Sequence, residues 1–247
     1  MFSTKEPNYH LQDNSIDVWL CQADSLQDRL DYFLSLLSSE EASRAERFKF
    51  NIHRNRFIVS HGFMRSVLAK YLNIEPSDIK YQKTEMGKPF LIEEDNTPAL
   101  KFNLSHTQDI ALLAVTRKAQ VGLDIEYMER KTDWQGICKR FFTQAEQDVL
   151  FALAETKQSQ AFFQLWTRKE AYMKVLGTGL SLSPTKFTLT VPPEKPALIQ
   201  HHSKKYQQFE QLEFIDIDLP ESLNHYCATL AAETSIHECH GYFFRLY

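Results

Sequence analysis

Residues 166–180 read Trp-Thr-Arg-Lys-Glu-Ala-Tyr-Met-Lys-Val-Leu-Gly-Thr-Gly-Leu and are the most informative part of this chain. Apolar residues recur over 162–176 at about 100° per residue, which predicts an amphipathic helix. Lys169 lies near the middle of the apolar face, whereas Glu170 and Lys174, four residues apart, share its edge. A cation in an apolar face costs free energy unless a partner neutralises it. The helix therefore carries either a snorkelling lysine beside a surface ion pair, which is the more common arrangement, or charged groups that serve a site.

The stretch Val-Gly-Leu-Asp-Ile-Glu at 121–126 alternates apolar and polar residues, which predicts a strand. Asp124 and Glu126 then share one face, about 7 Å apart, and repel each other unless a cation lies between them. A solvated strand face is the more common explanation of such a pair. Glu170 as a third carboxylate, together with neighbouring lysines, favours a site for Mg²⁺ and a phosphate group instead.

Composition excludes several classes of protein. The chain has 247 residues, 43% of them hydrophobic, so it can form one large domain or two small ones around a substantial core. A net charge of −4 and a pI near 6.1 argue against nucleic acid as a partner. The four cysteines show no CxxC spacing, and no stretch is long and apolar enough for a signal peptide or a membrane span. We therefore expect a reduced, soluble, cytoplasmic protein with no membrane contact.

Helix and strand signals are mixed in both halves of the chain, which favours an α+β fold. Two capping boxes, Ser38 with Glu41 and Thr143 with Glu146, predict helix starts. The other predicted elements are a strand at 17–21, a helix from about 57 to 72, strands at 79–83, 90–91, 100–104, 110–116 and 121–126, a charged irregular stretch at 127–140, and strands at 186–191, 197–201, 210–217, 225–231 and 240–246.

Three further groups could hold a phosphate or a flat ring, although each has a simpler structural explanation. Ser105 and His106 end a strand, where they either contact a ligand or cap a turn. The segment 87–89, Gly-Lys-Pro, is either a ligand-contacting turn or an ordinary one. Arg44 and Arg56 could clamp a phosphate or belong to a solvated basic face.

Other common sites are not supported. A zinc site at the C-terminal His and Cys residues lacks ligand spacing. Glycine-rich dinucleotide, Walker and nucleophile-elbow motifs are absent from the sequence.

Taken in order, these segments resemble the 4′-phosphopantetheinyl transferases of the surfactin-synthetase-activating type. The resemblance runs from about residue 37 to 190, and the last fifty residues carry no recognised motif. It rests on Arg47-Phe48, Arg56-Phe57 with Arg65, Gly87-Lys88-Pro89, Phe102-Asn103-Leu104-Ser105-His106, Gly122-Leu123-Asp124-Ile125-Glu126, Arg140-Phe141-Phe142, and Trp166 to Leu180 with Lys169-Glu170-Ala171, Lys174, Gly177 and Gly179.

The resemblance implies a pseudo-dimer of two similar α/β subdomains, 1–117 and 118–247, with coenzyme A and Mg²⁺ between them. Its activity would be transfer of 4′-phosphopantetheine from coenzyme A to a serine of an apo acyl, peptidyl or polyketide carrier protein, with release of 3′,5′-ADP. A fused pseudo-dimer is expected to be a monomer. A non-catalytic coenzyme A or nucleotide-binding module and a Mg²⁺-dependent phosphoesterase are the alternatives.

The resemblance also implies a role for each motif residue. Asp124, Glu126 and Glu170 would hold the metal, with Glu170 as the candidate base. Lys174 would contact the pyrophosphate, and Lys169 would add positive charge. The remaining contacts to coenzyme A would come from Arg44, Arg56 and His106 at the 3′-phosphate and from Gly87, Lys88, Pro89 and Ser105 at the adenine.

Two expectations concern features particular to this chain. Where relatives often carry lysine, this chain has Glu41, which predicts a looser or differently built 3′-phosphate clamp. The stretch 127–140, with Arg130, Lys131, Lys139 and Arg140, is the predicted docking surface for an acidic carrier protein.

Overall fold

The computed structural model describes residues 1–3, 7–92, 99–201, 212–233 and 238–246. The helices are α1 (Leu30–Leu36), α2 (Ser39–Glu46), α3 (Asn51–Leu72), α4 (Trp134–Phe141), α5 (Gln144–Ala152) and α6 (Glu155–Leu176). The strands are β1 (Phe2–Ser3), β2 (Ser15–Gln22), β3 (Tyr81–Lys83), β4 (Pro89–Leu91), β5 (Lys101–Thr107), β6 (Ile110–Thr116), β7 (Val121–Tyr127), β8 (Phe187–Leu189), β9 (Leu198–His201), β10 (Leu212–Asp216), β11 (Tyr226–Glu233) and β12 (Glu238–Phe243).

The order of elements repeats. A strand (β2 or β7) leads into a group of helices that ends in a 22-residue helix (α3 or α6), followed by a short hairpin (β3/β4 or β8/β9) and an antiparallel pair (β5/β6 or β10/β11). The antiparallel sets β5-β6-β2 and β10-β11-β7 correspond to each other. The fold is therefore α+β and contains two similar halves, as the resemblance implied.

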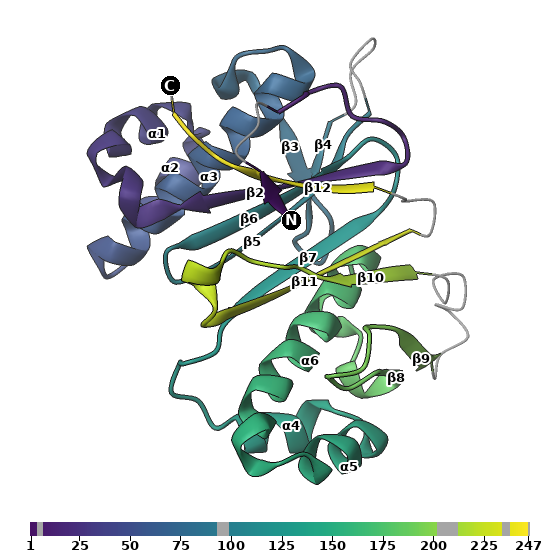
Figure 1. Ribbon diagram of the computed structural model, residues 1–247. Coiled ribbons are helices and arrows are strands. Elements are labelled where there is room, and N and C mark those ends of the chain that lie inside the picture. Colours follow the sequence, from purple (N-terminus) through teal and green to yellow (C-terminus); the bar gives the residue numbers. More distant parts are fainter. Residues whose placement is uncertain (4–6, 93–98, 202–211, 234–237, 247) are drawn as a thin grey trace.

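The last strand ties the two halves together. β12 returns to the first half and lies between β1 and β2, in parallel with both, to give the sheet order β1-β12-β2-β6-β5. In Figure 1 the yellow β12 accordingly lies against the purple β2. The final residues of the chain thus complete a sheet begun by the first ones.

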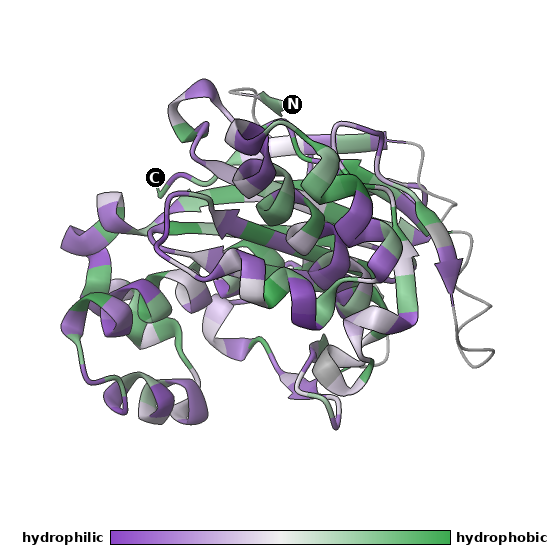
Figure 2. Cartoon of the chain, turned by 90° about the horizontal axis from the view of Figure 1, so that it is seen from below, coloured by the Kyte–Doolittle hydropathy of each residue, from purple (hydrophilic) through white to green (hydrophobic). Residues whose placement is uncertain are grey.

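The two sheets pack face to face in the middle of the molecule. Helices α1–α3 lie on one side and α4–α6 on the other (Figure 1). Figure 2 shows the central strands largely in the green of hydrophobic residues. Ile16, Val18 and Leu20 of β2 share one buried cluster with Leu123 and Ile125 of β7. Full burial of such a side chain contributes about 1.5–3 kcal/mol, so this apolar layer holds the two halves together. Because side chains alternate along a strand, the other residues of β7 point towards α6.

Both predicted capping boxes are present. The Ser38 hydroxyl accepts from the Glu41 N–H at 3.2 Å, and the Thr143 hydroxyl accepts from the Glu146 N–H at 3.3 Å. In each case the glutamate side chain accepts in return from the backbone N–H of the capping residue. Local sequence thus determines where α2 and α5 begin.

The two capping glutamates also form equivalent buried ion pairs. Arg65 pairs with Glu41 at 2.7 Å and Lys169 pairs with Glu146 at 2.9 Å. Each cation lies fourteen residues after the start of its 22-residue helix (51 to 65 and 155 to 169). Each also donates to the carbonyl of a proline and of the residue three positions later (76 and 79, 184 and 187). The repeated arrangement shows that Lys169 has a structural role matching that of Arg65.

The region 127–140 differs from its prediction, because residues 134–141 form helix α4 rather than an irregular stretch. Asp133 caps this helix by accepting from the Gly136 N–H at 3.0 Å. Residues 134, 137, 138 and 141 recur at helical spacing and pack into the core of the second half. The charged residues between them mask this pattern in the sequence. Lys139 and Arg140 therefore lie on a helix.

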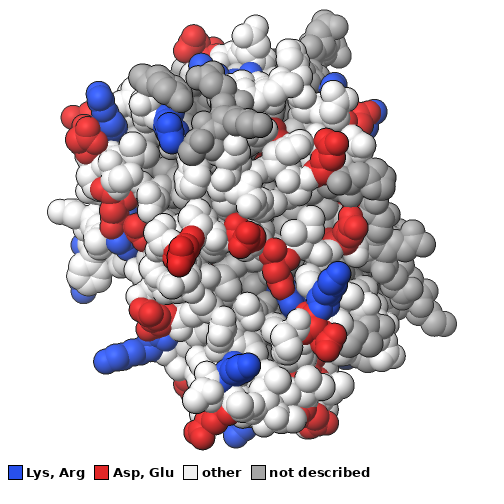
Figure 3. Space-filling model, viewed as in Figure 1, with Lys and Arg blue, Asp and Glu red and all other residues white. Residues whose placement is uncertain are grey.

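Figure 3 shows acidic side chains spread over the middle of one face of the molecule, so the described residues there form no continuous basic surface. Among the described helices, none combines the length and hydropathy needed to cross a bilayer.

Candidate functional site

A pocket of about 410 Å³ lies between the two halves. Residues from α2, α3, the β3–β4 hairpin and β5 form one side, and β7, α6 and the segment after β7 form the other. The residues singled out from the sequence that line it are Arg44, Gly87, Pro89, Ser105, His106, Asp124, Glu126 and Lys174. The fold thus gathers segments up to 130 positions apart in the sequence (44 to 174) around one cavity.

Gly122 explains how α6 reaches this pocket. A Cβ at this position would lie 2.1 Å from the Ala171 carbonyl oxygen and 2.4 Å from the Val175 nitrogen. Only glycine permits so close an approach of the helix backbone to β7. Because Asp124 lies on the same face of β7 two residues later, the contact brings Lys174 of α6 beside it.

Asp124 is the most constrained carboxylate in the pocket. Its side chain is 8% exposed, and Oδ1 accepts from Lys174 Nζ at 2.7 Å and from Ser105 Oγ at 3.1 Å. Lys174 donates further to the Leu123 carbonyl at 2.9 Å, which fixes the ammonium group. Asp124 Oδ2 is buried and has no hydrogen-bond partner among the described residues. Since buried polar atoms are nearly always paired, this unpaired oxygen is a candidate acceptor for a cation or for a donor from a ligand.

The negative charge of Asp124 acts on two further carboxylates, Glu126 and Glu170. Burial and the negative charge of Asp124 raise the pKa of Glu126 to about 7, against the opposing charge of Arg130. The same two causes raise the pKa of Glu170 to about 6, against the opposing charge of Lys174. Negative charges gathered in this way are stabilised by an added cation. Within the described ranges, no group of three His, Cys, Asp or Glu side chains already has the geometry of a metal site.

The opposite wall of the pocket is cationic. The Arg44 guanidinium lies over the Phe57 ring, 5.2 Å from its centroid, and the His61 ring lies 4.0 Å from the same centroid. His61 donates from Nδ1 to Glu41 at 2.7 Å, and His106 projects from the end of β5. Burial lowers the pKa of His106 to about 4, so Arg44 rather than His106 supplies positive charge on this side. An anionic ligand would find that charge on this side and carboxylates on the other.

Glu41 does not face the pocket. Burial alone would raise its pKa, but bonds from His61, Ser38 and Tyr81 hold the pKa of this carboxyl well below its usual range. Its oxygens also bind Arg65. The residue that replaces the expected lysine is thus committed to internal contacts, and it positions His61 from behind.

Four predicted site residues do not line the pocket: Arg56, Lys88, Lys169 and Glu170. Arg56 is held by Asp24 at 2.9 Å and reaches Gln108 at 3.2 Å. Lys169 is fully buried in its pair with Glu146, away from the pocket.

Lys88 connects the two halves. Its ammonium group donates to the Val121 carbonyl at 3.0 Å and to the Val175 carbonyl at 3.4 Å. Burial and the charges of Lys101 and Lys174 lower the pKa of Lys88 to about 8. The hairpin of the first half is thereby attached to β7 and to the last turn of α6.

Several lining residues were not assigned to the pocket from the sequence. They are His61, Met64, Tyr81, Lys83, Leu104, Thr107, Ile125 and Arg130. A histidine at position 61, in phase with the apolar residues of α3, was a usable signal. Arg130 was assigned to a docking surface and instead forms part of the pocket wall.

Comparison with known proteins agrees with this architecture. Residues 24–118 match the family description "4′-phosphopantetheinyl transferase, N-terminal", and residues 120–238 match "4′-phosphopantetheinyl transferase superfamily". The chain belongs to the 4′-phosphopantetheinyl transferase superfamily.

Its relatives cover most of the chain. One is the 4′-phosphopantetheinyl transferase HetI of Nostoc sp., 38% identical over 197 residues, or 79% of this chain and 82% of the relative. Another is the 4′-phosphopantetheinyl transferase Sfp of Bacillus subtilis, 31% identical over 163 residues, or 66% of this chain and 70% of the relative.

Proposed function

We propose that this protein transfers the 4′-phosphopantetheine group of coenzyme A to a serine hydroxyl of an apo acyl, peptidyl or polyketide carrier protein and releases 3′,5′-ADP. Membership of the superfamily supports the reaction. The observation that carries the proposal to this site is the buried, unpaired Oδ2 of Asp124 beside Lys174, in a pocket with a cationic wall.

The donor set fits Mg²⁺. Asp124 and Glu126 line the pocket, and Glu170, which does not line it, interacts with Asp124 through its charge. All three supply oxygen donors, which Mg²⁺ prefers, and the repulsion among them favours a divalent cation. We therefore assign these three residues to the metal. When bound, the ion would neutralise charge on the pyrophosphate and its leaving group.

The remaining residues act on the two substrates. Lys174 is held in place where it would bind the pyrophosphate, while Arg44 and His106 of the opposite wall would contact the 3′-phosphate. Gly87, Pro89 and Ser105 would lie along the adenine, with Lys88 securing the hairpin from behind.

Glu170 is the proposed base for the serine proton. Its pKa of about 6 leaves it mostly ionised at neutral pH yet basic enough to accept a proton. The base role and the metal role compete for this one carboxylate, and a Glu170→Gln variant tests whether the carboxylate is needed for turnover. We expect turnover to be lost while coenzyme A affinity changes little, and near-normal turnover would refute the base role.

We further propose that residues 1–117 supply most contacts to coenzyme A and residues 118–247 supply the carboxylates and the catalytic helix. This division concerns function only. Strand β12 belongs to residues 118–247 but completes the sheet of the first half, so the two segments do not fold separately. Both sides of the pocket come from one chain, so we expect an active monomer.

The test is intact-protein mass spectrometry of several apo carrier proteins incubated with this enzyme, coenzyme A and Mg²⁺. We expect each accepted carrier to gain the mass of one phosphopantetheine, and an Asp124→Asn variant and an EDTA control to abolish the gain. Coenzyme A binding without modification of any carrier would indicate a binding module. Hydrolysis of coenzyme A without a carrier would indicate a phosphoesterase.

A further inference from the structure

Arg130 occupies an unusual position in the pocket. It lies on the segment between β7 and α4, and its side chain reaches back to Glu126 four residues earlier. Nη1 lies 2.9 Å from Glu126 Oε2 in an ion pair, and Nη2 donates to Oε1 at 3.3 Å, so the guanidinium contacts both carboxylate oxygens. This forked contact occupies the oxygens that a divalent cation would need.

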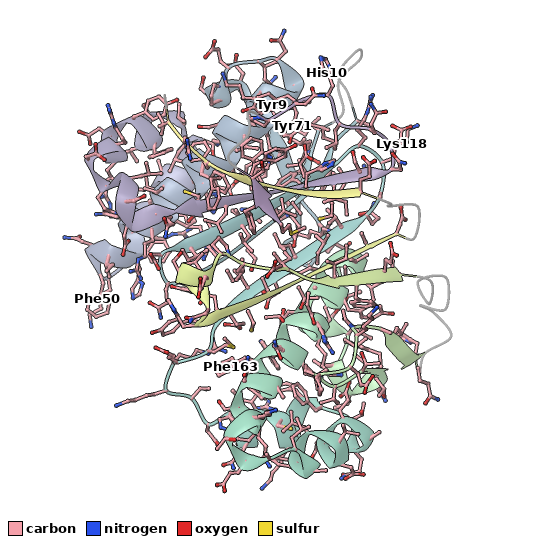
Figure 4. The ribbon with its side chains drawn as sticks, viewed as in Figure 1. Tyr9, His10, Phe50, Tyr71, Lys118 and Phe163 are labelled. Carbon is pink, nitrogen blue, oxygen red and sulfur yellow. The ribbon has the colours of Figure 1, made fainter. Side chains whose placement is uncertain are left out.

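The Arg130 guanidinium also packs on the aromatic ring of Phe163. It lies over the face of the buried Phe163 ring, 5.4 Å from the centroid, which holds a cation without engaging its N–H groups. Phe163, labelled in Figure 4, lies on α6 where that helix passes the segment that leaves β7. The Nε atom of Arg130 is buried and has no partner among the described residues. The guanidinium therefore has an unpaired N–H group besides the two nitrogens that contact Glu126.

Lys174 and Arg130 neutralise neighbouring carboxylates in different ways. Lys174 belongs to α6 and also binds the Leu123 carbonyl, so it is fixed by the fold. The segment that carries Arg130, residues 128–133, is neither helix nor strand. Arg130 can therefore leave Glu126 through changes in a short segment, whereas Lys174 could leave Asp124 only by also giving up its bonds to the Leu123 carbonyl and the Ser105 hydroxyl.

We propose that Arg130 is a positioning residue that alternates between two anions: it holds Glu126 before the divalent cation binds, and it binds the pyrophosphate of coenzyme A once the cation has taken Glu126. This inference rests on the proposed function. A planar fork suits both partners, since carboxylate and phosphate each accept two parallel N–H bonds. Arg130 would thereby couple cation binding to substrate binding.

The test measures the affinities for Mn²⁺ and for coenzyme A, which removal of Arg130 should change in opposite directions. Mn²⁺ binding to the free protein is followed by electron paramagnetic resonance, and coenzyme A binding at saturating Mg²⁺ by calorimetry. The variants are Arg130→Gln and Arg130→Lys, and Lys131→Gln is the matched control because it removes one exposed positive charge from the adjacent position. Carrier modification by the unaltered protein is measured in parallel.

We expect Arg130→Gln to bind Mn²⁺ more tightly than the unaltered protein, because a competitor for Glu126 is gone. The same variant should bind coenzyme A about tenfold more weakly, since a charge-assisted bond is lost. Arg130→Lys should have affinities for Mn²⁺ and coenzyme A between those of Arg130→Gln and those of the unaltered protein, because lysine keeps the positive charge but lacks the forked pair of N–H groups. Lys131→Gln should leave both affinities within about twofold of the unaltered protein.

Two results would overturn the inference: coenzyme A affinity in Arg130→Gln equal to that in the Lys131 control, or weaker Mn²⁺ binding in Arg130→Gln. Either can occur while the unaltered protein still modifies carriers, in which case the proposed function stands. Failure of the unaltered protein to bind coenzyme A would instead reject the proposed function.

Discussion

Replacing Lys169 by methionine removes a fully buried ammonium group that makes three contacts. Lys169 lies 2.9 Å from Glu146 and donates to the Pro184 carbonyl at 2.7 Å and the Phe187 carbonyl at 3.0 Å. Removing one partner of a buried ion pair costs about 3–5 kcal/mol, because the other charge stays buried without compensation. For a chain of this size that corresponds to a fall in melting temperature of about 6–20 °C.

The assay is urea denaturation followed by fluorescence, with a double-mutant cycle of Lys169→Met and Glu146→Gln. We expect each single variant to be destabilised and the double variant to lose less than the sum, with a coupling of about 1–3 kcal/mol. Lys157→Met is the matched control, because it makes the same substitution at an exposed position of the same helix. It should change stability by less than about 0.5 kcal/mol.

Coenzyme A affinity separates a structural lysine from a ligand-binding one. Because Lys169 does not line the pocket, folded Lys169→Met protein should bind coenzyme A within about twofold of the unaltered protein. A tenfold loss of affinity in a variant as stable as the Lys157 control would refute the argument. Additive effects in the cycle would show that the pair with Glu146 carries no coupling energy.

Three further predictions follow from the geometry. The pKa of Glu126 is raised from 4.5 to about 7, so ionisation of this carboxyl lowers the free energy of unfolding. This destabilisation is absent below about pH 4.5 and complete above about pH 7. In metal-free buffer, Glu126→Gln should therefore be about 1–3 kcal/mol more stable than the unaltered protein at pH 8 and show little gain at pH 5, and equal gains at both pH values would contradict this. Gly122→Ala should cost about 3 kcal/mol and abolish carrier modification, because its methyl group meets the α6 backbone; an active variant of normal melting temperature would exclude the close contact. Tyr71→Phe removes the hydroxyl that donates to Asp17 and accepts from Trp19 at 2.9 Å, so it should cost about 1–3 kcal/mol in urea denaturation without changing coenzyme A affinity.

Predictions from the sequence succeeded where local interactions decide the outcome. The alternation in 121–126 predicted a strand with Asp124 on the face opposite Leu123, and the capping boxes predicted the starts of α2 and α5. These features depend on side-chain period and on contacts between residues three or four apart. The prediction was wrong for 134–141, where charged residues obscure an apolar stripe that becomes a helix once it has a core to pack against.

Sequence alone therefore determined most of the elements, though not α1 or α4, together with the α+β class and the family to which the chain belongs, because periodicity, capping and motif order are written along the chain. Only the tertiary structure decided which charges meet. Lys169 and Lys174 are five residues apart on one helix, yet the first pairs with Glu146 in the interior and the second with Asp124 at the pocket. Which carboxylate faces each lysine depends on how α6 packs against β7 and α5. That packing is set by contacts between distant segments, such as the approach that Gly122 permits.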